Sequence, residues 1–221
     1  YRATGPYSRN PVPTGFMMNA AVDTVVFDLG NVLIDWDPRH LYRQVFDDEA
    51  RVEQFLRDVC SPDWIRQSDA GKPMAQCVAE LADQHPHEAE FIELFESRWP
   101  QMMRQCIGGS LQILEKLKSQ GTPLFVLSNW SADTWPRAVE QFDFLDLFDG
   151  LVVSGLEGVA KPEPEIYRRL ERFGVNLERA AFIDDRPENI EAANALGMTG
   201  ILFTEADVLA TRLSELGLLA E

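Results

Sequence analysis

Four short stretches of this chain follow an apolar run or a turn with side chains that can do acid–base, metal or nucleophilic chemistry. They contribute Asp28 (from VVFDLGNV), Ser128 and Asn129 (from VLSNW), Lys161 (from GVAKPEPEIY), and Asp184 and Asp185 (from FIDDRPEN). An ionised carboxylate can attack phosphorus and form an aspartyl-phosphate, provided that a divalent cation and a lysine offset the repulsion between the two anions. Adjacent carboxylates disfavour each other's ionisation unless a cation lies beside them, and oxygen ligands suit Mg²⁺. The residue types therefore predict phosphoryl chemistry with bound Mg²⁺.

Each of these residues also has an ordinary structural explanation. Asp28 can form a turn, Ser128 or Asp185 can begin a helix as its N-cap, and Lys161 can be a surface charge. Taken singly, none of them indicates an active site. Four such loops, each at a predicted strand end or next to one, are difficult to obtain by capping alone. In open α/β sheets ligands bind beyond the carboxyl ends of the strands, so the chemical interpretation depends on these loops meeting at one edge.

The elements that must position these residues alternate along the chain. Continuous apolar runs, typical of strands buried on both faces, predict strands over 24–30, 123–129, 150–155, 180–185 and 199–204. Apolar residues at helical spacing predict helices over 110–120, 162–173 and 185–196, each followed by a glycine. In the last helix we expect Asp185 to be the N-cap. The alternation predicts an α/β fold with a doubly wound, Rossmann-like parallel sheet.

One segment interrupts this alternation, from about His40 to Met103. It shows no evident strand, but helical stretches are predicted over 48–60, 74–84 and 88–103. Because the segment is too long for a single crossover, we interpret it as a helical insertion between the first and second core strands. The predicted division is a leader or tag-like segment of residues 1–18, a core of residues 19–38 and 104–221, and an inserted helical subdomain of residues 39–103.

Composition narrows the class of protein. The chain has 221 residues, a formal net charge of −16 and no basic tract, so we expect no nucleic-acid partner. No apolar run approaches the roughly 20 residues of a membrane helix, and we expect no membrane partner. Three cysteines without CxxC spacing favour a reducing cytoplasm over a disulfide framework, and we expect them to be buried as small hydrophobic residues.

The four stretches, in this order, resemble the motifs of the haloacid dehalogenase superfamily, whose phosphatases carry them on a Rossmann-like sheet. The resemblance covers residues 22–40 and 105–205, and the insertion lies where the family has its type-1 helical cap. A DLGNV first motif combined with two aspartates in the fourth motif is similar to a subgroup that includes sugar-phosphate phosphatases. The resemblance implies a hydrolase of small phosphorylated substrates, working as a monomer or homodimer.

The resemblance also implies a role for each matching residue. Asp28 corresponds to the nucleophile, Ser128 to the hydroxyl that holds the phosphate, and Lys161 to the charge that binds both. Asn129 corresponds to a residue beside the phosphate. The implied Mg²⁺ ligands are Asp28, the backbone carbonyl of Gly30, Asp184 and Asp185. Flap and cap residues are expected to select the substrate, and Trp36 and Arg39 are the first candidates; further candidates are Trp64, Gln67, Trp130 and Trp135.

Gly30 departs from the family pattern. Most phosphatases of the superfamily have a second aspartate there, which protonates the leaving oxygen and then activates water. Glycine keeps the carbonyl but has no acid–base group, which is typically worth about 10²–10⁴ in rate. Asp35 and Asp37 are the nearest acids later in the segment and are candidates to replace it.

Three functions are compatible with these residues. The first is a Mg²⁺-dependent phosphatase that acts on a small phosphomonoester through an aspartyl-phosphate. The second is a 2-haloacid dehalogenase, in which Asp28 would form an ester; such enzymes also lack the second aspartate, but they need no metal and usually lack the acidic pair. The third is a binding or regulatory protein with negligible catalysis.

Overall fold

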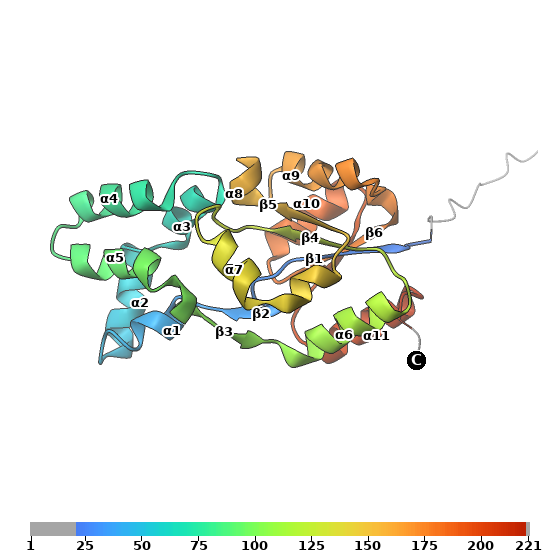
Figure 1. The fold of residues 1–221 in the computed structure, drawn as a ribbon, viewed down its shortest axis with the longest axis horizontal. Helices are drawn as coiled ribbons and strands as arrows, with labels where there is room; N and C mark the ends of the chain where they lie inside the picture. Colours follow the sequence, from blue (N-terminus) through green and yellow to red (C-terminus); the bar gives the residue numbers. More distant parts are fainter. Residues whose placement is uncertain (1–20, 220–221) are drawn as a thin grey trace, which may run out of the picture.

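The computed structural model describes residues 21–219, and its centre is a parallel sheet of five strands (Figure 1). The strands follow the order β5-β4-β1-β6-β7 across the sheet. Their bounds are β1 Thr24–Phe27, β4 Leu124–Ser128, β5 Gly150–Val153, β6 Ala180–Asp184 and β7 Thr199–Leu202. Each strand lies inside a stretch for which the sequence predicts one, so the predicted parallel α/β sheet is confirmed. The predicted leader, residues 1–18, lies outside the described residues.

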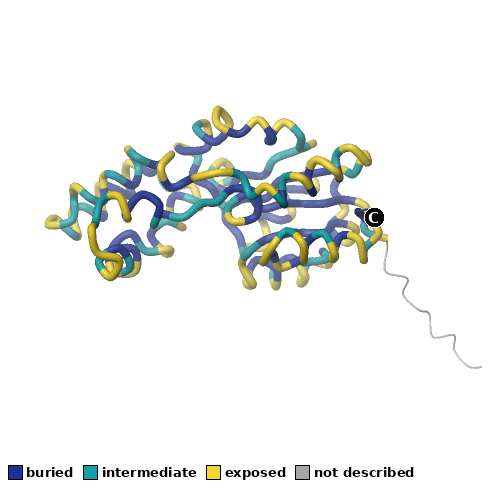
Figure 2. Tube along the Cα trace, turned by 90° about the horizontal axis from the view of Figure 1, so that it is seen from below, coloured by how far each residue is buried: buried dark blue, intermediate teal, exposed yellow. Residues whose placement is uncertain are grey.

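Both faces of the sheet are covered, as the continuous apolar runs require. Successive side chains of a strand point to opposite faces. In β1, Val25 and Phe27 join one apolar cluster and Val26 joins the other. Helices α6 (Gly108–Ser119) and α11 (Ala206–Glu215) cover the first face, whereas α9 (Pro164–Arg168) and α10 (Pro187–Ala195) cover the second. Figure 2 shows the resulting buried strands between half-exposed helices.

The remaining elements of the sheet-containing part are short. They are α7 (Trp135–Gln141), α8 (Ser154–Glu157) and three 3₁₀ helices over Asp143–Leu147, Arg169–Phe173 and Leu177–Arg179. The helix predicted over 162–173 is therefore α-helical only in its first part and continues as a 3₁₀ helix. The predicted N-cap Asp185 is wrong, because Arg186 occupies that position ahead of Pro187. Helix α11 has no counterpart among the predicted helices.

Between β1 and β4 the chain forms a helical lobe, defined here as residues 37–102 (Figure 1). The chain enters it from β2 (Ile34–Trp36) and leaves it into β3 (Met103–Cys106), and these two strands pair antiparallel. The lobe contains α1 Arg39–Tyr42, α2 Glu49–Asp58, α3 Pro62–Asp69, α4 Met74–Gln84, α5 Ala89–Ser97 and a 3₁₀ helix over Trp99–Met102. The sequence predicts α2, α4 and α5, but misses α1, α3 and the two-stranded connection.

Aromatic side chains form the interior of the helical lobe. Tyr42 and Phe55 are fully buried, and their ring centroids are 4.7 Å apart. Trp64 packs against Phe95 with its centroid at 4.9 Å, and its indole N–H donates to the carbonyl of Cys77 at 3.1 Å. This interior is continuous with the apolar cluster on one face of the sheet. The lobe is therefore held to the sheet-containing part by shared packing.

The cysteines are unpaired, in agreement with the sequence. Cys60 and Cys77 are buried, whereas Cys106 is half-buried and lies in β3 rather than in a helix. Over residues 21–219, no helix combines the length and the apolar character that are needed to cross a membrane.

Candidate active site

The parallel register brings the ends of three strands to one edge of the sheet. Phe27, the last residue of β1, is aligned with Val126 of β4 and with Ile183 of β6. Asp28 therefore follows directly at the edge, next to the end of β6, and its N–H donates to the carbonyl of Ile183 at 2.9 Å. Asp184 ends β6 and is completely buried. The distant stretches of sequence do meet in space, as the chemical interpretation requires.

Three carboxylates gather at this edge. Asp28, Asp184 and Asp185 each offer an oxygen atom, and these oxygens lie within 4.8 Å of one another. Asp28 and Asp184 are buried, whereas Asp185 is half-buried and lines the pocket described below. Such a cluster is unfavourable in isolation, because each negative charge raises the free energy of the others.

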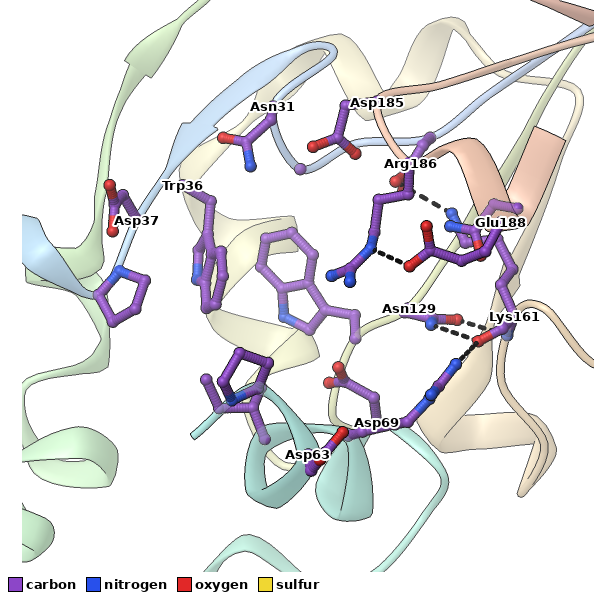
Figure 3. Close-up of a pocket in the computed structure, with 18 of the residues that line it drawn as sticks. Asn31, Trp36, Asp37, Asp63, Asp69, Asn129, Lys161, Asp185, Arg186 and Glu188 are labelled. Carbon is purple, nitrogen blue, oxygen red and sulfur yellow. Dashed lines mark hydrogen bonds and ion pairs between the residues drawn. The ribbon is translucent and has the colours of Figure 1, made fainter. Parts of the chain in front are cut away.

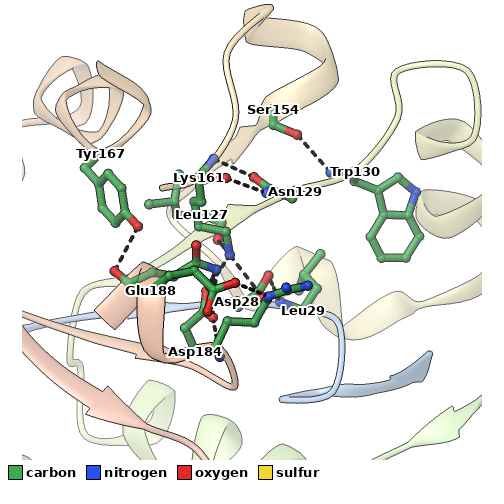
Figure 4. Close-up of polar contacts among 12 residues, drawn as sticks. Asp28, Leu29, Leu127, Asn129, Trp130, Ser154, Lys161, Tyr167, Asp184 and Glu188 are labelled. Atoms are coloured by element: carbon green, nitrogen blue, oxygen red, sulfur yellow. Dashed lines mark hydrogen bonds and ion pairs between the residues drawn. The ribbon is translucent and has the colours of Figure 1, made fainter. Parts of the chain in front are cut away.

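Lys161 is the buried positive charge of the cluster (Figure 4). Its ammonium lies 3.0 Å from Oδ2 of Asp28 and 2.6 Å from Oδ2 of Asp184, and donates to the carbonyl of Leu127 at 2.9 Å. Burial by itself lowers the pKa of this lysine, but the two carboxylates outweigh that effect and raise it. Lys161 is therefore held in its charged form between the two aspartates.

Asn129 holds the backbone of Lys161. Its side-chain carbonyl accepts from the Lys161 N–H at 2.8 Å, and its amide donates to the Lys161 carbonyl at 3.1 Å. The sequence places Asn129 beside the substrate. It does line the pocket, but its two hydrogen bonds go to the backbone of Lys161. Asn129 therefore fixes the position from which the lysine side chain extends.

Asn189 is a site residue that the sequence analysis misses. Its amide donates to both oxygens of Asp184, at 2.9 and 3.0 Å, and fixes the plane of that carboxylate. The hydroxyl of Tyr167 in turn donates to the backbone carbonyl of Asn189 at 2.9 Å. A signal was available, because Asn189 lies in the first turn of the helix that follows the acidic pair.

Positive charge is scarce among these groups. The pKa of Asp28 is raised to about 7, chiefly by burial; Lys161 and a hydrogen bond from Ser128 act to lower it, whereas Asp184 and Asp185 act to raise it. Burial and the neighbouring Asp184 also raise the pKa of Asp185. Three clustered carboxylates with one buried lysine leave an excess of negative charge, and only oxygen ligands surround it. The donor set therefore fits a hard divalent cation such as Mg²⁺.

A pocket of about 370 Å³ opens over the carboxylates, between the sheet edge and the helical lobe (Figure 3). Gly30 lines it next to Asp28, and a Cβ added to this glycine would meet no atom within 4 Å. Trp36, Trp99 and Trp130 contribute apolar surface to the same pocket. The site thus combines an anionic floor with a partly aromatic wall.

The other candidate residues lie at different places in the structure. Trp36 and Arg39 line the pocket as the sequence predicts, but the guanidinium of Arg39 forms an ion pair with Glu53, with Nε to Oε1 at 2.6 Å. Trp64 and Trp135 are buried elsewhere and do not line this pocket. Gln67 lies on another depression, away from the carboxylates. Ser128 is buried beside Asp28 at the end of β4.

Comparison with known proteins agrees with this geometry. A family model described as haloacid dehalogenase-like hydrolase matches residues 22–197. The sesquiterpene phosphatase astK of Aspergillus oryzae is 30% identical over 189 residues, which cover 82% of this chain and 89% of that protein. The flavin mononucleotide hydrolase 1 of Arabidopsis thaliana is 32% identical over 114 residues, which cover 51% of this chain and 46% of that protein.

Solved structures show the same fold at lower identity. A predicted HAD-like family hydrolase from Porphyromonas gingivalis superimposes with a TM-score of 0.68, at 20% identity, covering 89% of this chain and 98% of that one. The L-2-haloacid dehalogenase of Xanthobacter autotrophicus superimposes with a TM-score of 0.60, at 18% identity, covering 90% of this chain and 85% of that one. Both similarities concern the fold.

Proposed function

Because this chain belongs to the haloacid dehalogenase-like hydrolase family, we propose that it is a Mg²⁺-dependent phosphatase of small phosphomonoesters. The observation that carries the proposal is the cluster of Asp28, Asp184 and Asp185 around the buried ammonium of Lys161. An anionic nucleophile that is surrounded by two further carboxylates needs a cation beside it, and phosphoryl transfer uses such a cation to neutralise charge. The similarity to a named phosphatase over most of both chains supports the same reaction class.

In this proposal Asp28 is the nucleophile. One carboxylate oxygen accepts the backbone N–H of Leu29 at 2.7 Å and the other lies 3.0 Å from the Lys161 ammonium, so the group is fixed from both sides. An Asp28 oxygen attacks phosphorus and forms an aspartyl-phosphate as the bond to the leaving oxygen breaks. Water then attacks the phosphorus and returns Asp28 to its carboxylate form.

The other groups at the sheet edge lower the charge cost of this reaction. Asp28, the Gly30 carbonyl, Asp184 and Asp185 would hold Mg²⁺, which when bound supplies positive charge to the phosphoryl oxygens. Lys161 binds both the nucleophile and the phosphoryl group, and the Ser128 hydroxyl donates to a phosphoryl oxygen. Asn129 keeps the lysine loop in place through its two backbone hydrogen bonds.

We assign the choice of substrate to the lobe side of the pocket. Residues 39–103 would form a cap that completes the site over the carboxylates and excludes water. Trp36 from β2 and Trp130 after β4 face the same pocket as Asp28 and offer flat apolar surface. The proposed substrate is a sugar phosphate or another small organic phosphate. The protein would act on it in the cytoplasm, as a monomer or a homodimer.

The decisive experiment measures phosphate release from a panel of phosphorylated metabolites with Mg²⁺ and after its chelation. We expect Mg²⁺-dependent release that Asp28→Asn abolishes, whereas Asp58→Asn, an exposed aspartate on α2, keeps the wild-type rate. Release that survives both chelation and Asp28→Asn would reject the proposal.

The second candidate is a 2-haloacid dehalogenase, and Gly30 is the observation that favours it. In that reaction Asp28 would displace halide and form an ester, so no acid is needed at position 30. The acidic pair argues against it, because a metal-independent displacement has no use for Asp184 and Asp185 together. Halide release from 2-chloropropionate in the presence of a chelator, measured in parallel, decides between the two.

A further inference from the structure

Gly30 leaves an acid–base function without a side chain, and the pocket contains several acids that could supply it. Besides Asp28 and Asp185, the acids that line the pocket are Asp35, Asp37, Asp63, Asp69 and Glu188. A group that moves a proton at the leaving oxygen must face the pocket and must be free of strong permanent partners. These two conditions exclude three of the five acids.

Three of the five acids are already engaged. Asp35 accepts the His40 Nε2 at 2.8 Å, and Asp37 accepts the backbone N–H of Arg39 at 2.8 Å and its guanidinium at 3.3 Å. Glu188 accepts the Nε of Arg186 at 2.7 Å. Such contacts hold a carboxylate in one orientation and occupy its oxygens, which leaves it less free to exchange a proton with a substrate. Asp35 and Asp37, the first acids after Gly30 in the sequence, are therefore poorly suited to the role.

Asp63 and Asp69 remain, and they come from the same helix. Ser61 caps α3 and Pro62 begins it, which places Asp63 in the exposed first turn. Asp69 is the last residue of α3, is half-buried, and points into the pocket in Figure 3. Its carboxylate accepts no hydrogen bond and forms no ion pair with any residue between 21 and 219.

The end of α3 is held close to the lysine loop. The guanidinium of Arg66, one turn before Asp69, donates to the backbone carbonyl of Lys161 at 3.1 Å. In addition, the N–H of Met74 donates to the carboxylate of Asp133 at 2.7 Å, which fixes the start of α4 to the loop after β4. These two contacts with loops at the sheet edge hold the end of α3 in place, and Asp69 is thereby held in the wall of the pocket that contains Asp28.

The surroundings of Asp69 also favour a proton-carrying carboxyl. Burial raises its pKa to about 7, although the charges of Lys161 and Arg66 lower it. A catalytic acid or base works best when its pKa lies near the operating pH, since both protonation states are then available.

We propose that Asp69 is the general acid and base that replaces the side chain missing at Gly30, an inference that rests on the proposed phosphatase function. In the first step an Asp28 oxygen bonds to phosphorus, the bond from phosphorus to the leaving oxygen breaks, and the Asp69 proton passes to that oxygen. In the second step a water oxygen bonds to phosphorus, its proton passes to the Asp69 carboxylate, and the bond from Asp28 to phosphorus breaks. One water is consumed, the alcohol and inorganic phosphate leave, and both aspartates return to their initial states.

The same side chain can serve both steps because leaving oxygen and attacking water occupy the same side of the phosphorus. In-line displacement places both opposite Asp28, which is the side where the helical lobe closes the pocket. An acid on α3, which lies on that side, is therefore oriented for both proton transfers.

The test compares Asp69→Asn with Asp63→Asn, a matched neutralisation on the same helix and in the same pocket. Both purified variants are first checked for wild-type unfolding midpoints. The probes are glycerol 2-phosphate, whose alkoxide is a poor leaving group, and 4-nitrophenyl phosphate, whose phenolate leaves without a proton. We expect Asp69→Asn to lower turnover of glycerol 2-phosphate about 10²–10⁴-fold, and Asp63→Asn, at an exposed position of the same pocket, to have a far smaller effect.

Two further readouts separate an acid–base role from a structural one. With 4-nitrophenyl phosphate, Asp69→Asn should release a stoichiometric burst of 4-nitrophenolate and accumulate the phosphorylated protein, because only water attack lacks its base. Wild-type turnover of glycerol 2-phosphate should decline above about pH 7, where Asp69 loses its proton, and this decline should be absent in the variant.

Unchanged turnover in Asp69→Asn, or an equal loss on both substrates without a burst, overturns the assignment while the proposed function stands. A wild-type protein that releases phosphate from neither probe nor from any phosphorylated metabolite overturns both.

Discussion

The ammonium of Lys161 lies 3.0 Å from the carboxylate of Asp28, and both groups are buried. A buried carboxylate without this partner would be neutral or would destabilise the fold, because desolvation of a charge is costly. The contact therefore has two effects. It lowers the pKa that burial raises and so favours the ionised form of the proposed nucleophile. It also ties the loop after α8 to the end of β1, so the site and the fold depend on the same pair.

Replacing the lysine should affect stability and activity together. We expect Lys161→Met to lower the free energy of unfolding by about 3–5 kcal/mol in the absence of metal, because removal of one partner leaves buried charge uncompensated. Turnover should be lost as well. Urea unfolding in the presence of a chelator measures the first effect.

The control for that variant is Lys118→Met, since Lys118 pairs with Asp149 at 2.7 Å on the surface. Exposed pairs contribute about 0–1 kcal/mol, so this variant should unfold near the wild-type midpoint. If both variants lost a similar free energy of unfolding, burial would not be the reason that the Lys161 ion pair contributes to stability.

Mg²⁺ should stabilise the folded protein through the carboxylate cluster. Binding to the native state alone adds about 2.7 kcal/mol at a Mg²⁺ concentration roughly 100 times Kd, which a thermal unfolding scan detects readily. Asp185→Asn should abolish the response. At pH 8 the same variant should be more stable than wild type without metal, because burial and Asp184 raise the pKa of Asp185 and the folded wild type therefore holds an unfavourable charge there. Asp63→Asn, in the same pocket, should keep the wild-type response.

Replacing Trp64 should chiefly affect stability, whereas replacing Trp36 should chiefly affect substrate binding. Trp64 is buried against Phe95 in the helical lobe, so Trp64→Ala should lower the free energy of unfolding by about 3–5 kcal/mol. Trp36 is half-buried and lines the pocket, so Trp36→Ala should chiefly raise KM for an organic phosphate. Unfolding midpoints and steady-state kinetics of both variants check the contrast; a KM increase confined to Trp64→Ala would contradict it.

Much of this arrangement follows from local sequence because the sheet is buried on both faces. The residues of β1, β4 and β6 are all buried, and continuous apolar runs reveal such strands without further information. A parallel sheet then places the ends of its strands at one edge. The apolar runs and the parallel alternation are therefore sufficient to group Asp28, Ser128 and Asp184.

Other parts depend on tertiary contacts that no local pattern encodes. Strands β2 and β3 have three and four residues and pair with a register shift, so they are too short for a periodic pattern to reveal them. Asp69 is one acid among many on the helical lobe, and tertiary contacts such as that of Arg66 with the lysine loop bring it to the pocket. The aromatic residues were ambiguous for the same reason: Trp36 faces the pocket and Trp64 does not, although their sequence contexts are similar.

Asp69 should make stability depend on pH in a defined direction. Burial raises its pKa to about 7, against 3.8 for an ordinary aspartate, so the folded protein holds this proton more tightly than the unfolded chain does. Stability is therefore lost as pH rises from about 4 to about 7. The stability of Asp69→Asn relative to wild type should increase by on the order of 1–2 kcal/mol between pH 4.5 and pH 8. Urea unfolding at both values measures it, and a pH-independent difference would show that Asp69 is solvated like a surface aspartate.

An aspartate placed at position 30 should restore what Asp69→Asn removes. A Cβ at Gly30 meets no atom within 4 Å, and the backbone there is not in the left-handed region, so Gly30→Asp should fold normally. If proton transfer at the leaving oxygen is what Asp69 supplies, the double variant Gly30→Asp/Asp69→Asn should regain at least about tenfold of the lost turnover of glycerol 2-phosphate. It should gain little on 4-nitrophenyl phosphate in the first step, because that leaving group needs no proton.

Gly30→Asn in the same Asp69→Asn background is the matched control, since it has nearly the same shape but no titratable proton. Steady-state turnover on glycerol 2-phosphate compares the two double variants. Rescue by asparagine as well as aspartate would mean that filling the space beside Asp28, rather than moving a proton, is what limits the reaction. Rescue by aspartate alone would place the proton-transfer function of this site on a residue of α3 and show that the two positions, although on opposite sides of the pocket, act on the same oxygen.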